Sequence, residues 1–113
     1  MKSILRLFLL VSLLATPALA DPAPQVIEIT AKKFEFTPSH IVVKKGVPVV
    51  LRFRSLDRKH GFKVPDLGLQ AEIKPGAPTE VKFTPDKTGT FGFACSVFCG
   101  SGHEDMGGEI VVE

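Results

Sequence analysis

Two cysteines, a histidine and a methionine lie close together between Cys95 and Met106. Three residues separate Cys95 from Cys99, three more separate Cys99 from His103, and two separate His103 from Met106. Thiolate and thioether ligands favour copper, and imidazole suits both copper and zinc. Methionine is not among the usual ligands of zinc, so Met106 favours copper. The spacing therefore predicts a sulfur-rich copper site.

A second histidine is expected to come from a different strand. His60 is the candidate, because it follows an arginine-rich strand whose end can lie at the same pole as the cysteine-containing loop. His40 precedes another strand and has no cysteine or methionine neighbour, so a surface or edge position is expected for it.

Two other interpretations of the cysteines remain open. A structural disulfide is usual in an exported protein, but a bridge across so short a loop gains little chain entropy and leaves the nearby histidines and methionine without a role. A mononuclear blue-copper centre would use one thiolate, two imidazoles and an axial thioether, from Cys99, His60, His103 and Met106. Cys95 would then be spare.

Other chemistry has weaker support. Ser96 and Ser101 lie near a histidine, but no carboxylate is evident to complete a triad. Glu104 and Asp105 are hard anionic ligands, for which a solvated position is expected. Five basic residues cluster around His60 in the sequence, and they indicate either a solvated strand face or a basic rim that steers an acidic redox partner: Arg52, Arg54, Arg58, Lys59 and Lys63.

The amino-terminal segment has the features of a cleaved secretory signal. Lys2 and Arg6 form a basic start, Leu7 to Ala15 is apolar, and Ala18-Leu19-Ala20 provides small residues before a cleavage site. We therefore assign residues 1–20 to a signal peptide and expect a periplasmic protein, with an uncleaved amino-terminal anchor as the alternative.

The remaining chain, residues 21–113, is predicted to be one domain without a membrane span. Removal of Lys2 and Arg6 leaves twelve basic residues against twelve acidic ones. A chain so close to neutral has no electrostatic basis for nucleic-acid binding.

Apolar residues alternate with polar ones along most of this domain, as in "VIEIT" (26–30), "FEFTP" (34–38) and "VPVVLRFRS" (47–55). The pattern recurs at 80–83 and 90–93, and proline and glycine separate the runs. Short strands at such spacing predict an all-β sandwich or barrel.

The ligand spacing resembles the binuclear copper A site of cytochrome c oxidase subunit II and nitrous-oxide reductase, and the strand layout from about 26 to 112 is similar to the cupredoxin fold, a Greek-key sandwich. The resemblance implies two copper ions per chain, in place of the one ion of a blue-copper centre. It implies that the thiolates of Cys95 and Cys99 bridge the two coppers. It further implies that the imidazoles of His60 and His103 bind one copper each. The thioether of Met106 and the backbone carbonyl of Val97 are then implied to complete the site.

Two departures from the family bear on function. Val97 stands where oxidase subunits usually carry an acidic residue, and the chain has no Trp or Tyr near the copper or elsewhere. We therefore expect a free-standing one-electron carrier rather than an enzyme by itself, with a c-type cytochrome or a terminal oxidase or reductase as partner. If the chain is part of an enzyme, an oxidase-type oxidoreductase is implied. A copper-delivery protein with the same ligands is a further alternative.

Overall fold

The structure is a computed structural model, and it describes residues 23–96 and 106–113. Nine strands and one 3-10 turn make up this part of the chain. The strands are β1 (Gln25–Lys32), β2 (Glu35–Thr37), β3 (His40–Val43), β4 (Val49–Ser55), β5 (His60–Val64), β6 (Leu69–Ile73), β7 (Thr79–Phe83), β8 (Gly89–Ala94) and β9 (Gly107–Val112), and the turn η1 is Pro65–Leu67.

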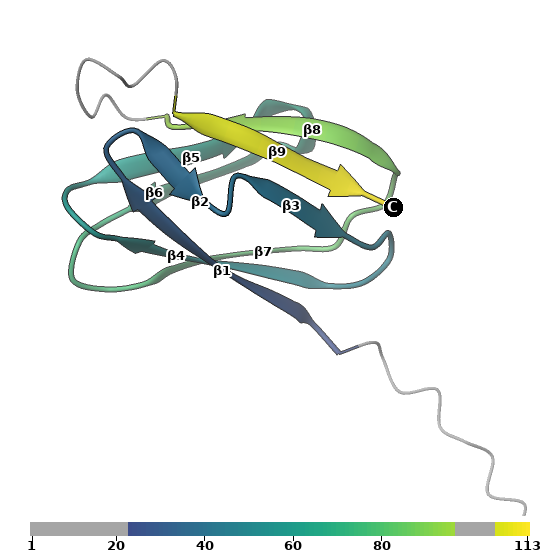
Figure 1. The fold of residues 1–113 in the computed structure, drawn as a ribbon. Coiled ribbons are helices and arrows are strands. Elements are labelled where there is room, and N and C mark those ends of the chain that lie inside the picture. Colours follow the sequence, from purple (N-terminus) through teal and green to yellow (C-terminus); the bar gives the residue numbers. More distant parts are fainter. Residues whose placement is uncertain (1–22, 97–105) are drawn as a thin grey trace, which may run out of the picture.

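The strands form two sheets that pack face to face (Figure 1). The four-stranded sheet has the order β2-β1-β4-β7, and the five-stranded sheet has the order β3-β9-β8-β5-β6. β1 pairs with β4, and β3 with β9, in parallel, while the other pairs are antiparallel. The predicted all-β sandwich is confirmed.

Alternation along β4 shows why the sequence pattern predicted a sandwich. Val49, Leu51 and Phe53 are at most 1% exposed and face the core, whereas Arg52 and Arg54 point to the other side of the sheet. Successive side chains of a strand point to opposite faces, so the run 49–54 builds both a core face and a solvent face.

Two strands were not predicted. β5 and β6 lie between the arginine-rich strand and the next alternating run, and they pair with each other from His60↔Ile73 to Val64↔Leu69. β5 is buried at four of its five positions, and because it opens with a histidine and a glycine, its sequence does not show a clear apolar–polar alternation. His60 therefore begins a strand of the five-stranded sheet, and is separated from β4 by a four-residue loop.

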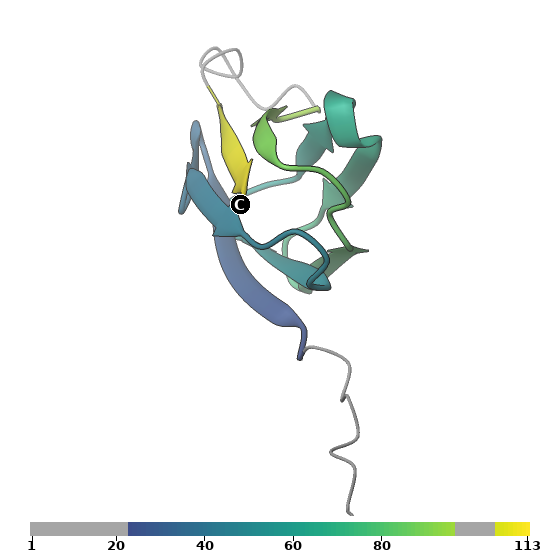
Figure 2. The ribbon, with the colours of Figure 1, turned by 90° about the vertical axis from the view of Figure 1, so that its right-hand side faces the viewer.

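Phenylalanine side chains fill the space between the sheets. Phe36 and Phe53 come from the four-stranded sheet, and Phe62 and Phe93 from the five-stranded sheet. Their ring centroids lie 4.5 to 6.4 Å apart, in tilted and edge-to-face arrangements that aromatic pairs prefer. Figure 2, viewed from the end at which the carboxyl terminus lies, shows the strands arranged around this core.

One end of the sandwich gathers the chain segments of functional interest, and we call it the ligand end. There β4 and β8 end, β5 and β9 begin, and the β1–β2 turn lies against the β4–β5 loop. The opposite end carries the β3–β4 turn, tied to Glu113 and Pro85 by backbone hydrogen bonds. Within the described ranges, no helix has the length and apolar character needed to cross a membrane.

Candidate metal centre

Three of the six predicted ligands lie in the described ranges, and all three are buried at the ligand end. His60, Cys95 and Met106 are 0, 3 and 1% exposed. They belong to or flank β5, β8 and β9, which are neighbours in the five-stranded sheet. Each continues the inward-facing alternate positions of its strand, so the three side chains lie beyond the phenylalanine layer at the same end of the core.

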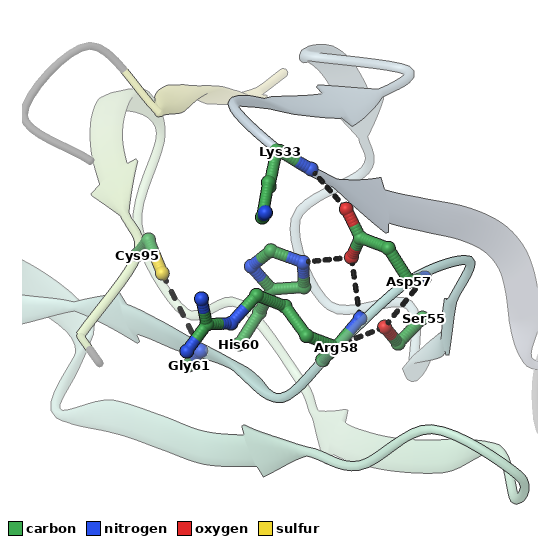
Figure 3. Close-up of polar contacts among 7 residues, drawn as sticks. All are labelled: Lys33, Ser55, Asp57, Arg58, His60, Gly61 and Cys95. Atoms are coloured by element: carbon green, nitrogen blue, oxygen red, sulfur yellow. Dashed lines mark hydrogen bonds and ion pairs between the residues drawn. The ribbon is translucent and has the colours of Figure 1, made fainter. Parts of the chain in front are cut away.

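His60 is held by a carboxylate from the β4–β5 loop. Its Nε2 lies 2.6 Å from Oδ1 of Asp57 (Figure 3). An ionised carboxylate only accepts hydrogen bonds, so Nε2 carries the ring hydrogen, and in the neutral ring Nδ1 keeps its lone pair.

The Nδ1 atom of His60 is itself buried and has no hydrogen-bond partner among the described residues. Buried polar atoms in folded proteins rarely lack a partner. In Figure 3 the ring edge that carries Nδ1 is turned toward the side on which Cys95 lies. An inward-facing imidazole nitrogen with a lone pair is the donor that a copper ion requires.

Asp57 is fixed by several groups at once. Its Oδ2 accepts a hydrogen bond of 2.7 Å from the Lys33 backbone N–H, and its Oδ1 accepts one of 2.6 Å from the Arg58 backbone N–H. Burial acts to raise the pKa of Asp57, but hydrogen bonds from Lys33, His60 and Arg58 outweigh it and lower the pKa to about 2. The carboxylate is therefore ionised at neutral pH and supports the ring from the side opposite Nδ1.

Cys95 is positioned by backbone contacts on two sides. The backbone N–H of Gly61 donates to Cys95 Sγ over 3.5 Å, which ties the cysteine to the residue after His60. The backbone N–H of Cys95 donates to the carbonyl of Met106 over 3.0 Å, which extends the β8–β9 pairing by one step. These contacts place the imidazole, thiol and thioether positions on adjoining backbone segments.

Gly108 allows β9 to pack closely at the ligand end. A Cβ atom there would lie 2.1 Å from the Ser39 carbonyl oxygen and 2.5 Å from Cζ of Phe93. No side chain fits at such distances, and the Glu109 N–H donates to the same Ser39 carbonyl over 2.8 Å. The glycine therefore lets the start of β9, and Met106 before it, lie against β3 and β8.

The other three predicted ligands, Val97, Cys99 and His103, lie outside the described residues. Within residues 23–96 and 106–113, no three His, Cys, Asp or Glu side chains are grouped so that they could hold a metal ion. His40 is exposed on β3, where its Nδ1 lies 2.8 Å from Glu109 Oε1.

The structure separates the basic residues that cluster around His60 in the sequence. The Arg52 side chain lies 3.8 Å from a Glu28 carboxylate oxygen on the outer face of the four-stranded sheet, and Lys59 is paired with Glu72 at 2.9 Å. Arg58 remains next to the histidine.

Sequence reasoning missed Asp57, Gly61 and Lys33. Asp57 stands three residues before a candidate histidine ligand, which was the only available signal, and an aspartate in a turn is too common to be specific.

Comparison with known proteins identifies the family. Residues 4–112 match the cupredoxin-like domain. The chain belongs to the cupredoxin-like family. It is 33% identical over 103 residues to cytochrome c oxidase subunit 2 of Thermus thermophilus, and this alignment covers 83% of this chain and 76% of that protein. Nitrous-oxide reductase of Pseudomonas fluorescens is 33% identical over 79 residues, which covers 66% of this chain and 12% of the enzyme. The resemblance to these two protein classes is confirmed.

A solved structure shows the same cupredoxin fold. The periplasmic domain of subunit II of the Bradyrhizobium japonicum cytochrome oxidase superimposes with a TM-score of 0.72 at 23% identity, over 79% of this cupredoxin and 83% of that chain. This cupredoxin spans a small part of nitrous-oxide reductase, so the reductase activity belongs to a much larger protein.

Proposed function

We propose that this cupredoxin is an exported one-electron carrier with a binuclear copper centre. The proposed ligands are the bridging thiolates of Cys95 and Cys99 and the imidazoles of His60 and His103. The thioether of Met106 and the backbone carbonyl of Val97 are the other two. When bound, such a pair of thiolate-bridged coppers shares one electron and so needs little reorganisation on electron transfer.

The observation that carries the proposal is the state of His60. The imidazole of His60 is fully buried, its Nδ1 has no hydrogen-bond partner in the part of the chain that the structure describes, and its Nε2 is held by an ionised carboxylate, as in carboxylate–histidine–metal sites. Cys95 and Met106 lie at the same end of the core, and this donor set is soft enough to favour copper over zinc. The membership in the cupredoxin-like family supports the same metal.

The residues around the proposed site act as a rigid frame. His60 and Cys95 are linked through Gly61, and Cys95 is linked to Met106, so these three donors cannot move independently. The Gly61 N–H at the Cys95 sulfur adds a hydrogen-bond donor, and such donors tune the potential of copper–thiolate sites. The phenylalanine layer excludes water from the inner side of the site.

The cellular setting is part of the proposal. We propose that residues 1–20 are a cleaved signal peptide, that residues 21–113 are the mature periplasmic domain, and that the partner is a c-type cytochrome or a terminal oxidase or reductase. The likeness to a periplasmic oxidase domain supports this setting. Sequencing the amino terminus of protein recovered from the periplasm tests it, because a chain that still begins at Met1 would contradict cleavage.

The test of the site is the copper content per mature chain, measured with electron paramagnetic resonance on the same sample. We expect two coppers that share one unpaired electron, with hyperfine splitting from both nuclei. One copper with splitting from a single nucleus would indicate the blue-copper alternative. If no copper is bound after reduction and reconstitution, the two cysteines are better explained as a structural disulfide.

Copper retention separates a carrier from a delivery protein. A carrier should keep its two coppers through repeated cycles of reduction by ascorbate and oxidation by hexacyanoferrate(III). A delivery protein should lose copper to a competing chelator during such cycles, and that outcome would overturn the carrier assignment while leaving the copper site in place.

A further inference from the structure

The turn and the loop that bond to Asp57 carry two exposed cations and an exposed apolar side chain. Lys33 and Arg58 are exposed, and Leu56 is 58% exposed although it is a large hydrophobic residue. Within the described ranges, neither the Lys33 nor the Arg58 side chain has an acidic partner, in contrast to Lys32, Lys59 and Lys82, which lie within 4 Å of glutamates. Exposed cations beside an exposed apolar side chain are complementary to a partner surface that is acidic and partly apolar.

Hydrogen bonds to Asp57 hold this surface in place. Lys33 and Arg58 donate their backbone N–H groups to the two carboxylate oxygens of Asp57, and in Figure 3 both side chains extend from there toward the His60 side. The Leu56 N–H donates to the Ala31 carbonyl over 2.9 Å, which fastens the β4–β5 loop to the end of β1. A preorganised surface loses little conformational entropy when a partner binds.

The same carboxylate connects this surface to the proposed copper ligand. The His60 side chain is 0% exposed, whereas the Asp57 side chain is 31% exposed and bonds His60 Nε2 at 2.6 Å. Asp57 is therefore the polar group that connects the buried His60 imidazole to the solvent on this side of the molecule. The rate of electron transfer falls steeply with distance. A partner bound at Asp57 would be separated from the His60 imidazole by this carboxylate and one hydrogen bond.

We infer that Lys33, Leu56 and Arg58 form an entry face, at which a redox protein with an acidic, partly apolar docking surface exchanges electrons with this cupredoxin. The inference rests on the proposed electron-transfer function and adds the location and the charge of the partner's surface. A basic partner would meet two exposed cations here, and like charges in contact disfavour a complex.

The first test uses the metal-free mature protein and therefore does not depend on copper. Hexacyanochromate(III), a redox-inert paramagnetic trianion, is added at low ionic strength while amide signals are followed by NMR, with diamagnetic hexacyanocobaltate(III) as the reference. We expect broadening of the Lys33, Leu56 and Arg58 amides, and its loss in the double variant Lys33→Glu/Arg58→Glu. Broadening confined to the opposite end, or spread evenly over all lysines, would overturn the entry face.

The second test measures electron transfer from the reduced, copper-loaded protein. One electron leaves the protein and converts one hexacyanoferrate(III) to hexacyanoferrate(II). Lys33→Glu/Arg58→Glu should lower the second-order rate constant about ten-fold at low ionic strength, and the difference should close as salt is added. The matched control is Lys44→Glu/Lys45→Glu, which makes the same change in net charge at the β3–β4 turn of the opposite end, and we expect a change of less than about two-fold.

Equal slowing in both double variants would show that net charge alone matters and would overturn the entry face. Binding to anionic phosphatidylglycerol vesicles that is lost in Lys33→Glu/Arg58→Glu, without an effect on the electron-transfer rate, would also overturn it, because the cations would then serve a membrane surface. A lack of bound copper would instead contradict the proposed function. The copper content of each sample therefore shows whether a result contradicts the entry face or the proposed function.

Discussion

The five-stranded sheet carries the three predicted ligands that the structure describes, whereas the segments connected to the four-stranded sheet carry the groups that hold one of them. His60, Cys95 and Met106 lie at or next to strand ends of β5, β8 and β9. Asp57 and Lys33 belong to the loop after β4 and the turn after β1. The two sheets meet at the ligand end through the Asp57–His60 bond, so metal binding and the packing of the sandwich are expected to depend on each other.

This comparison teaches that the two sides tolerate different changes. A ligand supplies a particular donor atom and has no substitute, while a supporting group supplies orientation, which neighbouring bonds can partly maintain. Removal of a ligand should therefore change the kind of site, and removal of support should change its strength.

The largest effect is expected at a ligand of the five-stranded sheet. Cys95→Ser should abolish the two-copper spectrum completely, because a hydroxyl does not replace a bridging thiolate. Electron paramagnetic resonance and copper content measure this, with Ser96→Ala, the adjacent residue, as the control. A Cys95→Ser protein that keeps the wild-type spectrum would rule out a binuclear centre, and one that keeps a single-copper signal would favour the blue-copper alternative.

The next largest effect concerns the packing that places β9. Gly108→Ala should lower the free energy of unfolding of the metal-free protein by about 3 kcal/mol, because the added methyl group overlaps the Ser39 carbonyl and the Phe93 ring. Chemical denaturation measures the change. Gly92→Ala on β8 is the matched control, since a Cβ atom there has no neighbour within 4 Å. Equal destabilisation by both variants would contradict a role for close packing at Gly108.

Loss of support from the four-stranded side should be milder than loss of a ligand. Asp57→Asn should leave two coppers bound but weaken copper affinity by about 10- to 100-fold, because the neutral amide no longer holds the charge-assisted bond to His60 Nε2. Competition with a copper chelator measures affinity, and Asp86→Asn at the opposite end is the control. Unchanged affinity in Asp57→Asn would show that the five-stranded sheet orients His60 without help.

The smallest effect is expected for a solvent-exposed pair at the edge of the five-stranded sheet. A hydrogen bond and the charge of Lys59 lower the pKa of Glu72 below its ordinary value of 4.5. A lowered carboxyl pKa stabilises the folded state above the unfolded pKa, and this contribution is lost as the pH falls through the folded pKa. Thermal unfolding of Glu72→Gln should therefore differ only slightly from wild type at pH 7 and not at all in strong acid. A large difference at pH 7 would contradict a screened surface pair.

The strand alternation was predictable wherever one face of a strand meets water. β4 has buried residues at alternate positions, and its sequence shows this directly. β5 also faces the core with alternate residues, His60, Phe62 and Val64, but it is five residues long and begins with a histidine and a glycine, so its sequence does not show the alternation of apolar and polar residues clearly. The strand that begins with a predicted ligand was therefore one of the two strands that the pattern failed to indicate.

The sequence by itself determined the donor types, their spacing and the all-β class, because residue identity and a period of two are local properties of the chain. Only the tertiary structure decided that Asp57 supports His60, that Nδ1 is the ring nitrogen facing the core, and which cations lie beside Asp57. These features depend on contacts of the β4–β5 loop with the β1–β2 turn and of β5 with the end of β8, in which Lys33 and Asp57 are 24 residues apart and Gly61 and Cys95 are 34 residues apart. Pairing at such separation depends on how the two sheets pack, and no local pattern encodes it.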